Sequence, residues 1–297
     1  MMIPPFLQSG DLVRVVATSG ALKEFDAFDR GVEIWRSRGY SVEFGQNFDR
    51  RHGYLAGTDA ERRQGLRDAW LDPDCKAILC ARGGYGSARL LEDWTWPEID
   101  RPKWIIGFSD VTGILWSLAR QGITGVHGAV LTTVAEESAR SLDRLFSLVE
   151  GGEIEPLTGE GWGGGKVSGR LLPANLTVAT HLLGTPVQPE LDGVILALED
   201  VTEAPYRIDR MLTQWRASGV FQKVKGIALG RFSRCEPPIG SDSQTVEEVL
   251  KDRLGDLQLP IVSGLSFGHD GENLALPVGT PAELDGNEGR LEIFPLK

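Results

Sequence analysis

One stretch of the chain decides the fold: WIIGFSDVTG, residues 104–113. Its first four residues are apolar and typical of a buried strand, and residues 111–121 have the apolar spacing of a helix. A strand that passes directly into a helix places Ser109 on a sharp turn, with its hydroxyl above the sheet edge. Free backbone N–H groups at the helix start would lie beside it. The stretch therefore predicts a βα unit with a reactive group at its turn.

The segments around this unit repeat the alternation of strand and helix. Strands alternating with helices are typical of βαβ units and a mostly parallel sheet. The strands are expected at residues 12–17, 41–44, 76–81 and 104–107, and the helices at residues 25–38, 59–70, 87–94, 111–121 and 138–150.

The composition of the sequence changes at residues 151–169, which contain eight glycines and show no clear hydrophobic period. We interpret residues 151–170 as a glycine-rich linker. The fold class is then α/β, with an N-terminal domain (1–150) built on a mostly parallel sheet. The C-terminal domain (171–297) is expected to be mixed α+β with short strands. Its helices are expected at residues 175–183, 206–218 and 245–254, and its clearest strands at 193–198 and 226–229.

Composition and charge exclude several classes of function. The net charge of −11 argues against nucleic acid or an anionic membrane as partner, because both need a basic face. Cys75, Cys80 and Cys235 show no metal-binding spacing and are expected to be buried free thiols, so we expect no metal and no cofactor. The first residues lack the pattern of a signal peptide, and no apolar run approaches the ~18 residues of a membrane span. A cytoplasmic location is expected.

A second turn, RGGYG at residues 82–86, also follows a buried strand. Its glycines permit positive φ and close approach of the backbone to a ligand. The spacing matches neither a phosphate-binding loop of the Walker type nor a dinucleotide fingerprint. A purely structural turn remains an alternative, but the carboxyl end of a parallel strand favours a ligand site.

Four histidines are candidates for a catalytic base. His52 lies in a polar stretch, and His181 lies in a predicted helix. His127 ends a short predicted strand, where it could line a pocket. His269 lies on a loop with glycines close on both sides, which suits a base that approaches from a second domain.

Three carboxylates could orient such a histidine. The predicted strand at 193–198 ends in Glu199 and Asp200, and Glu203 follows shortly after. A carboxylate at the end of a buried strand is costly to desolvate without a partner, which marks it as a site candidate. Spacing does not choose among the three. Nor does the turn alone establish Ser109 as a nucleophile, because serine and aspartate are also good helix caps.

Four motifs together make the chain resemble the L,D-carboxypeptidase family, which includes muramoyltetrapeptide carboxypeptidases and microcin C immunity peptidases. The resemblance covers nearly the whole chain. The motifs are RGGYG (82–86), GFSD (107–110), LED with APYRIDRML (198–212) and GHDGENLALPVG (268–279).

The resemblance implies a catalytic triad and its surroundings. Ser109 would be the nucleophile, His269 the base and Glu199 the acid that orients the histidine. The oxyanion would be held by the backbone N–H groups of Gly84 and Asp110. We further expect the RGGYG turn to contact the substrate through Arg82, Gly83 and Tyr85, since a guanidinium matches a free carboxylate.

The implied reaction is hydrolysis of an L,D-peptide bond, which releases a C-terminal D-amino acid from a murein tetrapeptide during peptidoglycan recycling. The mechanism would be that of a serine carboxypeptidase with an acyl-enzyme, acting as a homodimer on a small peptide. The alternative within hydrolases is an immunity-type peptidase that cleaves peptidyl or aminoacyl adenylates, with Trp162 as a candidate for stacking the base. A non-catalytic binding protein on the same scaffold is the alternative from another class.

Overall fold

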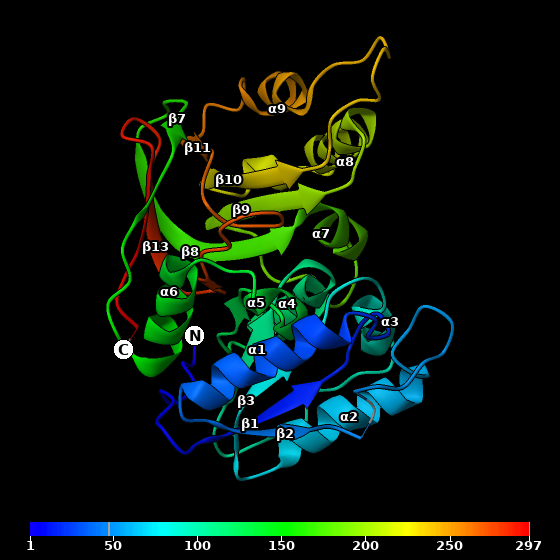
Figure 1. The fold of residues 1–297 in the computed structure, drawn as a ribbon. Helices are drawn as coiled ribbons and strands as arrows, with labels where there is room; N and C mark the ends of the chain where they lie inside the picture. Colours follow the sequence, from blue (N-terminus) through cyan, green and yellow to red (C-terminus); the bar gives the residue numbers. More distant parts are fainter. Residues whose placement is uncertain (47, 297) are drawn as a thin grey trace.

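A computed structural model describes residues 1–46 and 48–296, which form two sheets with helices packed around them (Figure 1). Each strand and helix predicted for residues 1–150 is present, with bounds that differ by at most three residues. The elements are β1 (Leu12–Val16), α1 (Phe25–Ser37), β2 (Ser41–Phe44), α2 (Asp59–Leu71), β3 (Cys75–Cys80), α3 (Ser87–Leu91), β4 (Trp104–Gly107), the 3-10 turn η1 (Ser109–Val111), α4 (Thr112–Arg120), β5 (Val126–His127), α5 (Leu131–Val134) and α6 (Ala139–Glu150).

The later elements form the second sheet and its helices. They are β6 (Leu157–Thr158), β7 (Glu160–Gly161), β8 (Lys166–Asn175), α7 (Leu176–Leu182), β9 (Val194–Val201), α8 (Pro205–Ala217), η2 (Val220–Gln222), β10 (Gly226–Ser233), α9 (Val246–Leu254), β11 (Ile261–Ser263), β12 (Leu276–Pro277), β13 (Pro281–Asp285) and β14 (Arg290–Ile293).

The two sheets confirm the predicted fold class. In the first sheet the order is β12-β5-β4-β3-β1-β2, and all pairs are parallel except β12 with β5. In the second the order is β6-β14-β13-β8-β9-β10-β11-β7, with a parallel centre of β8 to β11 and antiparallel strands on both sides. The central strands β9 and β10 are longer than expected, and β8 lies where the sequence predicts no strand. Strand β12 comes from the second half of the chain but completes the first sheet, so the halves are interlocked.

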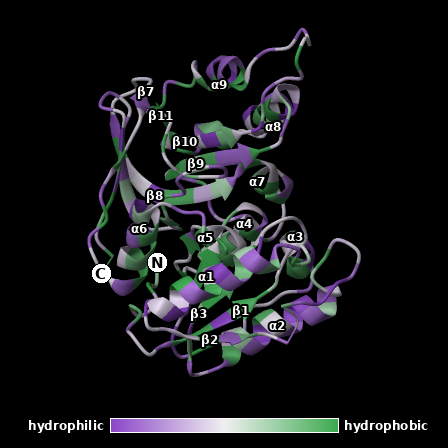
Figure 2. Ribbon diagram, viewed as in Figure 1, coloured by the Kyte–Doolittle hydropathy of each residue, from purple (hydrophilic) through white to green (hydrophobic). Residues whose placement is uncertain are grey.

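The core continues from one half into the other through α4. Residues 112–119 of this helix are all buried, because it lies between the first sheet and the elements β8 and α7. The Trp116 indole donates to the carbonyl of Pro173 at 3.1 Å, and Thr112 Oγ1 accepts from the amide of Asn175 at 3.0 Å. By contrast, α1 buries one face only, and Figure 2 shows both hydrophobic and hydrophilic colour along it.

Residues 151–170 are not the irregular linker that the sequence predicts, because β6, β7 and the first half of β8 lie within them. The glycines permit close contact between backbones. A Cβ at Gly161 would lie 2.2 Å from the carbonyl oxygen of Gly286, and one at Gly164 would lie 2.5 Å from the backbone of Leu259. The glycine-rich composition thus serves packing within the second sheet. The division of the chain into domains at this segment stays a prediction.

Two further expectations concern the whole chain. Cys75, Cys80 and Cys235 are free and buried, as predicted, and burial raises the pKa of the Cys75 thiol to about 11. No helix in residues 1–46 and 48–296 combines the length and the apolar character needed to cross a membrane.

The guanidinium of Arg62 is fully buried and ties α2 to two loops at the carboxyl end of the first sheet. Its Nη1 donates to the carbonyls of Thr18 at 2.6 Å and Gly86 at 2.8 Å, and its Nη2 donates to Asp59. Arg89 binds the same carboxylate, with Nη2 2.6 Å from Oδ2. The hydrogen bonds from Arg89 and Arg62 lower the pKa of Asp59 to about 2.

We expect Arg62→Met to lower the free energy of unfolding by about 3–5 kcal/mol, because removing one partner leaves buried polar groups unpaired. The measurement is urea denaturation at pH 7, followed by tryptophan fluorescence. Arg63→Met is the matched control on the same helix, since Arg63 lies 3.5 Å from an aspartate whose side chain is 78% exposed. A loss for Arg62→Met no larger than the ~1 kcal/mol of a surface pair would contradict the prediction.

Candidate active site

Ser109 lies on the sharp turn between β4 and α4, as the sequence predicts. Its φ is 60°, in the left-handed region that residues other than glycine rarely adopt. Such a conformation costs about 1–3 kcal/mol and persists only where the surrounding structure holds it. The turn leaves the side chain half-buried, at the carboxyl end of the first sheet.

The carboxylate of Asp110 holds this turn against the glycine turn that follows β3. It accepts hydrogen bonds from the amides of Ser87 at 2.8 Å and Gly86 at 3.3 Å, and the Ser87 hydroxyl donates to the Asp110 carbonyl. Burial raises the pKa of Asp110, and these hydrogen bonds oppose the rise. The side chain of Asp110 is thus a structural tie, while its amide remains the predicted oxyanion donor.

The backbone of the glycine turn passes directly over Ser109. A Cβ added at Gly83 would lie 3.2 Å from Ser109 Oγ and 3.9 Å from the Asp110 amide nitrogen. Gly84 has φ +110°, and its amide donates none of the hydrogen bonds found in residues 1–46 and 48–296. The arrangement suits an oxyanion site made of backbone amides.

Two other residues of this turn, Arg82 and Tyr85, differ in whether their side chains are already bound by other residues. Arg82 is already paired, with Nε 3.2 Å from a carboxylate oxygen of Glu24 and Nη1 3.3 Å from the carbonyl of Ala21. Tyr85 is exposed, and its ring centroid lies 6.0 Å from that of the exposed Tyr54. Tyr54 cannot be identified from the sequence, because nothing in its polar surroundings indicates that it would lie beside the turn.

Glu199 and His269 form a close pair. Nδ1 of His269 lies 2.7 Å from Oε2 of Glu199, whose side chain is completely buried near the end of β9. The His269 ring packs against Phe108, with centroids 4.6 Å apart, and therefore lies next to the turn that carries Ser109. No hydrogen bond joins Ser109 to His269 within the described residues. Catalytic hydrogen bonds often tighten only when substrate binds.

The loop that carries His269 is held by its backbone. Arg231 Nε and Ser233 Oγ both donate to the carbonyl of His269, at 3.0 and 2.6 Å. Gly268 has φ +103°, and a Cβ there would lie 2.8 Å from the Cβ of Glu199. Only glycine permits this approach of the loop to the carboxylate. Arg231 cannot be identified from the sequence, because its role depends on a contact between distant segments.

The same loop is also bound to the first half of the chain. Glu272 accepts hydrogen bonds from Ser138 Oγ at 2.7 Å and Arg140 Nη1 at 3.0 Å. The amide of Asn273 donates to Glu137 at 2.9 Å. The position of His269 relative to Ser109 is therefore set by contacts with both halves.

The structure shows which of the three carboxylates contacts His269, a choice that the sequence leaves open. Asp200 follows Glu199 on β9 and so points to the opposite face of the sheet. There its Oδ2 accepts from the amide and the hydroxyl of Thr177, both at 2.8 Å. Glu203 lies beyond the strand, 3.4 Å from Arg207. Only Glu199 of the three contacts His269.

The remaining histidines lie in different surroundings. His52 and His181 are exposed, and Nδ1 of His181 lies 2.6 Å from the carbonyl of Thr177. His127 is completely buried. No group of three or more metal-ligating side chains gathers anywhere in the described part of the chain.

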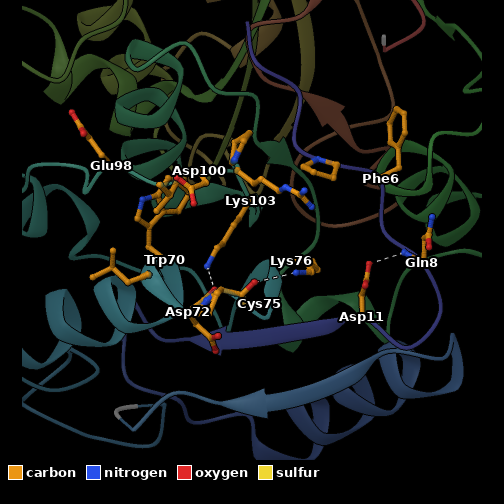
Figure 3. A pocket seen from close by; sticks show the side chains of 16 residues that line it. Phe6, Gln8, Asp11, Trp70, Asp72, Cys75, Lys76, Glu98, Asp100 and Lys103 are labelled. Carbon is orange, nitrogen blue, oxygen red and sulfur yellow. Dashed lines mark hydrogen bonds between the residues drawn. The ribbon is translucent and has the colours of Figure 1, made fainter.

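A cavity of about 740 Å³ lies at the other end of the first sheet (Figure 3). It adjoins the amino ends of β3 and β4, whereas ligands of parallel sheets bind at the carboxyl ends. Its lysines are already engaged: Lys103 donates to the carbonyls of Ala69, at 3.0 Å, and Asp72, and Lys76 donates to the carbonyl of Pro73 at 3.0 Å. We therefore place the candidate active site at Ser109 instead.

Comparison with known proteins shows the family of the chain. Residues 13–128 match the model of the LD-carboxypeptidase N-terminal domain, and residues 168–284 match that of the LD-carboxypeptidase C-terminal domain. The chain belongs to the LD-carboxypeptidase family. It is therefore a peptidase, and the resemblance seen in its four motifs is confirmed.

Among LD-carboxypeptidases and their relatives, the putative carboxypeptidase slr1534 of Synechocystis is 62% identical, over 97% of this chain and 96% of its own. The crystal structure of muramoyltetrapeptide carboxypeptidase from Oxalobacter formigenes is 30% identical, with a TM-score of 0.85 over 95% of this chain and 97% of its own. The microcin self-immunity protein MccF is 25% identical, with a TM-score of 0.89 over the full length of both chains.

The burial of Asp200 on the face of β9 opposite to Glu199 can be tested. Burial raises the pKa of Asp200 to about 6, above the unfolded value near 4, so the folded state binds the extra proton between these values. Its contribution to stability is therefore present at low pH and is lost as the pH rises from about 4 to 6. We expect the stability of the natural protein relative to Asp200→Asn to fall by on the order of 2–3 kcal/mol between pH 4 and pH 7.

The measurement is urea denaturation of both proteins across this pH range. Asp29→Asn, at an exposed position of α1, controls for the loss of one carboxylate. A stability difference between Asp200→Asn and the natural protein that does not change with pH would show that Asp200 is not buried as described.

Proposed function

We propose that this chain is a serine-type L,D-carboxypeptidase that releases a C-terminal D-amino acid from a murein tetrapeptide. The observation that carries the proposal is the Glu199–His269 pair, joined at 2.7 Å and packed against the residue that precedes Ser109. A nucleophile, a base and a carboxylate that orients the base are the parts of an acyl-transfer triad.

The mechanism follows from the positions of these groups. His269 takes the proton of the Ser109 hydroxyl as its oxygen attacks the amide carbonyl carbon. The amides of Gly84 and Asp110 hold the oxyanion. His269 then gives its proton to the nitrogen of the leaving D-amino acid, and the C–N bond breaks. A water, deprotonated by His269, hydrolyses the acyl-enzyme and restores Ser109. Glu199 keeps His269 oriented and stabilises the imidazolium in both steps.

The substrate assignment rests on the family and on the solved muramoyltetrapeptide carboxypeptidase. Gly83 of the glycine turn lies against Ser109, so we propose Gly83 and its neighbour Tyr85 as contacts of the peptide. Arg82 would bind the terminal carboxylate by exchanging its partner Glu24, which is half-exposed. The homodimer and the cytoplasmic location likewise remain proposals.

The alternative substrate, an aminoacyl adenylate, gains no support from Trp162. The indole nitrogen donates to Ser263 at 2.9 Å, and the amide of Trp162 pairs with Ile261. Strand β11 pairs with β10, and β10 pairs with β9. This register places Ile261 level with the amino-terminal half of β9, several residues before Glu199. Trp162 therefore lies beside β11, and β10 separates β11 from the strand that carries Glu199.

The test incubates UDP-MurNAc-tetrapeptide with the natural protein and with three variants, and follows the product by mass spectrometry. We expect the natural protein to release one terminal D-alanine. Ser109→Ala, His269→Gln and Glu199→Gln should each lower kcat by about 10⁴-fold or more, because the triad acts as a unit.

His181→Gln is the matched control, since this exposed histidine lies outside the site. An aminoacyl sulfamoyl adenosine is the second substrate in the same assay. Cleavage of the adenylate alone would replace the murein assignment. Unchanged D-alanine release by Ser109→Ala would overturn the serine mechanism.

A further inference from the structure

His127 is a buried polar residue that the proposed mechanism does not use. It ends β5 with no exposure to solvent, and both of its ring nitrogens lack a hydrogen-bond partner within residues 1–46 and 48–296. Aromatic rings enclose it, with centroid distances of 5.9 Å to Phe108 and 6.2 Å to Phe267. Buried polar groups are nearly always satisfied, so an unpaired pair of imidazole nitrogens calls for a functional explanation.

The surroundings of His127 connect it to the catalytic pair. Phe108 contacts both histidine rings, at 4.6 Å from His269 and 5.9 Å from His127. In the sheet, His127 pairs with Gly107, two residues before Ser109. The titratable groups close enough to act on His127 are Glu199 and His269.

Glu199 has an unpaired atom of its own. Oε2 binds His269, but Oε1 is buried and has no hydrogen-bond partner in the described residues. An ionised carboxylate oxygen without a donor is costly in a protein interior. The enclosed region beside the triad thus contains a potential donor, His127, and an acceptor that lacks one.

We propose that His127 is a positioning residue for the Glu199–His269 pair, and that its neutral imidazole supplies an N–H to Oε1 of Glu199, directly or through one ordered water. This role rests on the proposed triad and adds a fourth member to it. With Oε1 held, Glu199 keeps Oε2 turned toward His269. Triad carboxylates act by fixing the tautomer and orientation of the base, so a loosely held carboxylate would weaken catalysis.

The protonation state of His127 suits this role. Burial lowers its pKa to about 4, so the ring is neutral at pH 7. A neutral donor steadies the negative charge of Glu199 without adding a positive charge that would compete with the imidazolium of His269. The flanking strands β4 and β12 contain no titratable residue, and the one charged residue of α4, Arg120, is exposed at its far end.

The test measures how fast a fluorophosphonate labels Ser109, by intact mass, between pH 5.5 and 8. This probe needs the triad but no peptide substrate. In His127→Phe, the carboxylate of Glu199 loses its hydrogen-bond donor, so acidic conditions should weaken its hold on His269 more than in the natural protein. We expect labelling to slow by roughly tenfold or more at pH 5.5 and by less than about threefold at pH 8.

His127→Gln retains an N–H donor and should keep the natural pH profile within about threefold. Thr124→Val is the matched control, since it removes another buried and unpaired polar atom two residues before β5. If His127→Phe does not fold, the same comparison is made with His127→Met. A pH-independent loss, or an equal loss in the Phe and Gln variants, would overturn the role of His127. Absence of labelling in the natural protein would overturn Ser109 as nucleophile, and the role of His127 with it.

Discussion

The site depends on one constraint: the carboxylate of Glu199 is completely buried near the end of a central strand. An isolated charge there would be prohibitively costly, so the structure must bring a partner to it. That partner is His269, whose loop approaches closely only because Gly268 carries no side chain. Arg231 then holds the loop by its carbonyl oxygens. The geometry of the base thus follows from the need to compensate one buried charge.

This constraint also explains why the two halves of the chain cannot be independent at the site. Ser109 belongs to the first sheet, whereas Glu199 and His269 belong to the second half. Their relative position is fixed by strand β12, which crosses into the first sheet, and by the Asn273–Glu137 contact. Helix α4 starts just after Ser109 and is buried between both halves. A displacement of one half against the other would therefore disturb the core and the triad together.

Much of the first half could be predicted from the sequence, because strands and helices in βα units are decided by local apolar periods. The turn at Ser109 follows from the same pattern. The choice of Glu199 over Asp200 could not be predicted, since it depends on which face of β9 meets the histidine loop. Residues 151–170 were misread because glycines that permit close backbone packing look like those of a flexible joint. The roles of Arg231 and Tyr54 and the surroundings of His127 depend on contacts between distant segments, which no local pattern reports.

The strained turn at Ser109 is held by residues that lie well beyond the turn itself. A serine at φ 60° would relax unless its neighbours held it. Asp110 holds it through the amides of Gly86 and Ser87, and Arg62 holds the Gly86 carbonyl from α2. Buried charged groups such as Asp110 and Arg62 are poor sources of net stability, because the cost of their desolvation offsets much of what their polar contacts gain. Their value in this fold is positional: they keep the glycine turn over Ser109, where its amides can face a developing oxyanion.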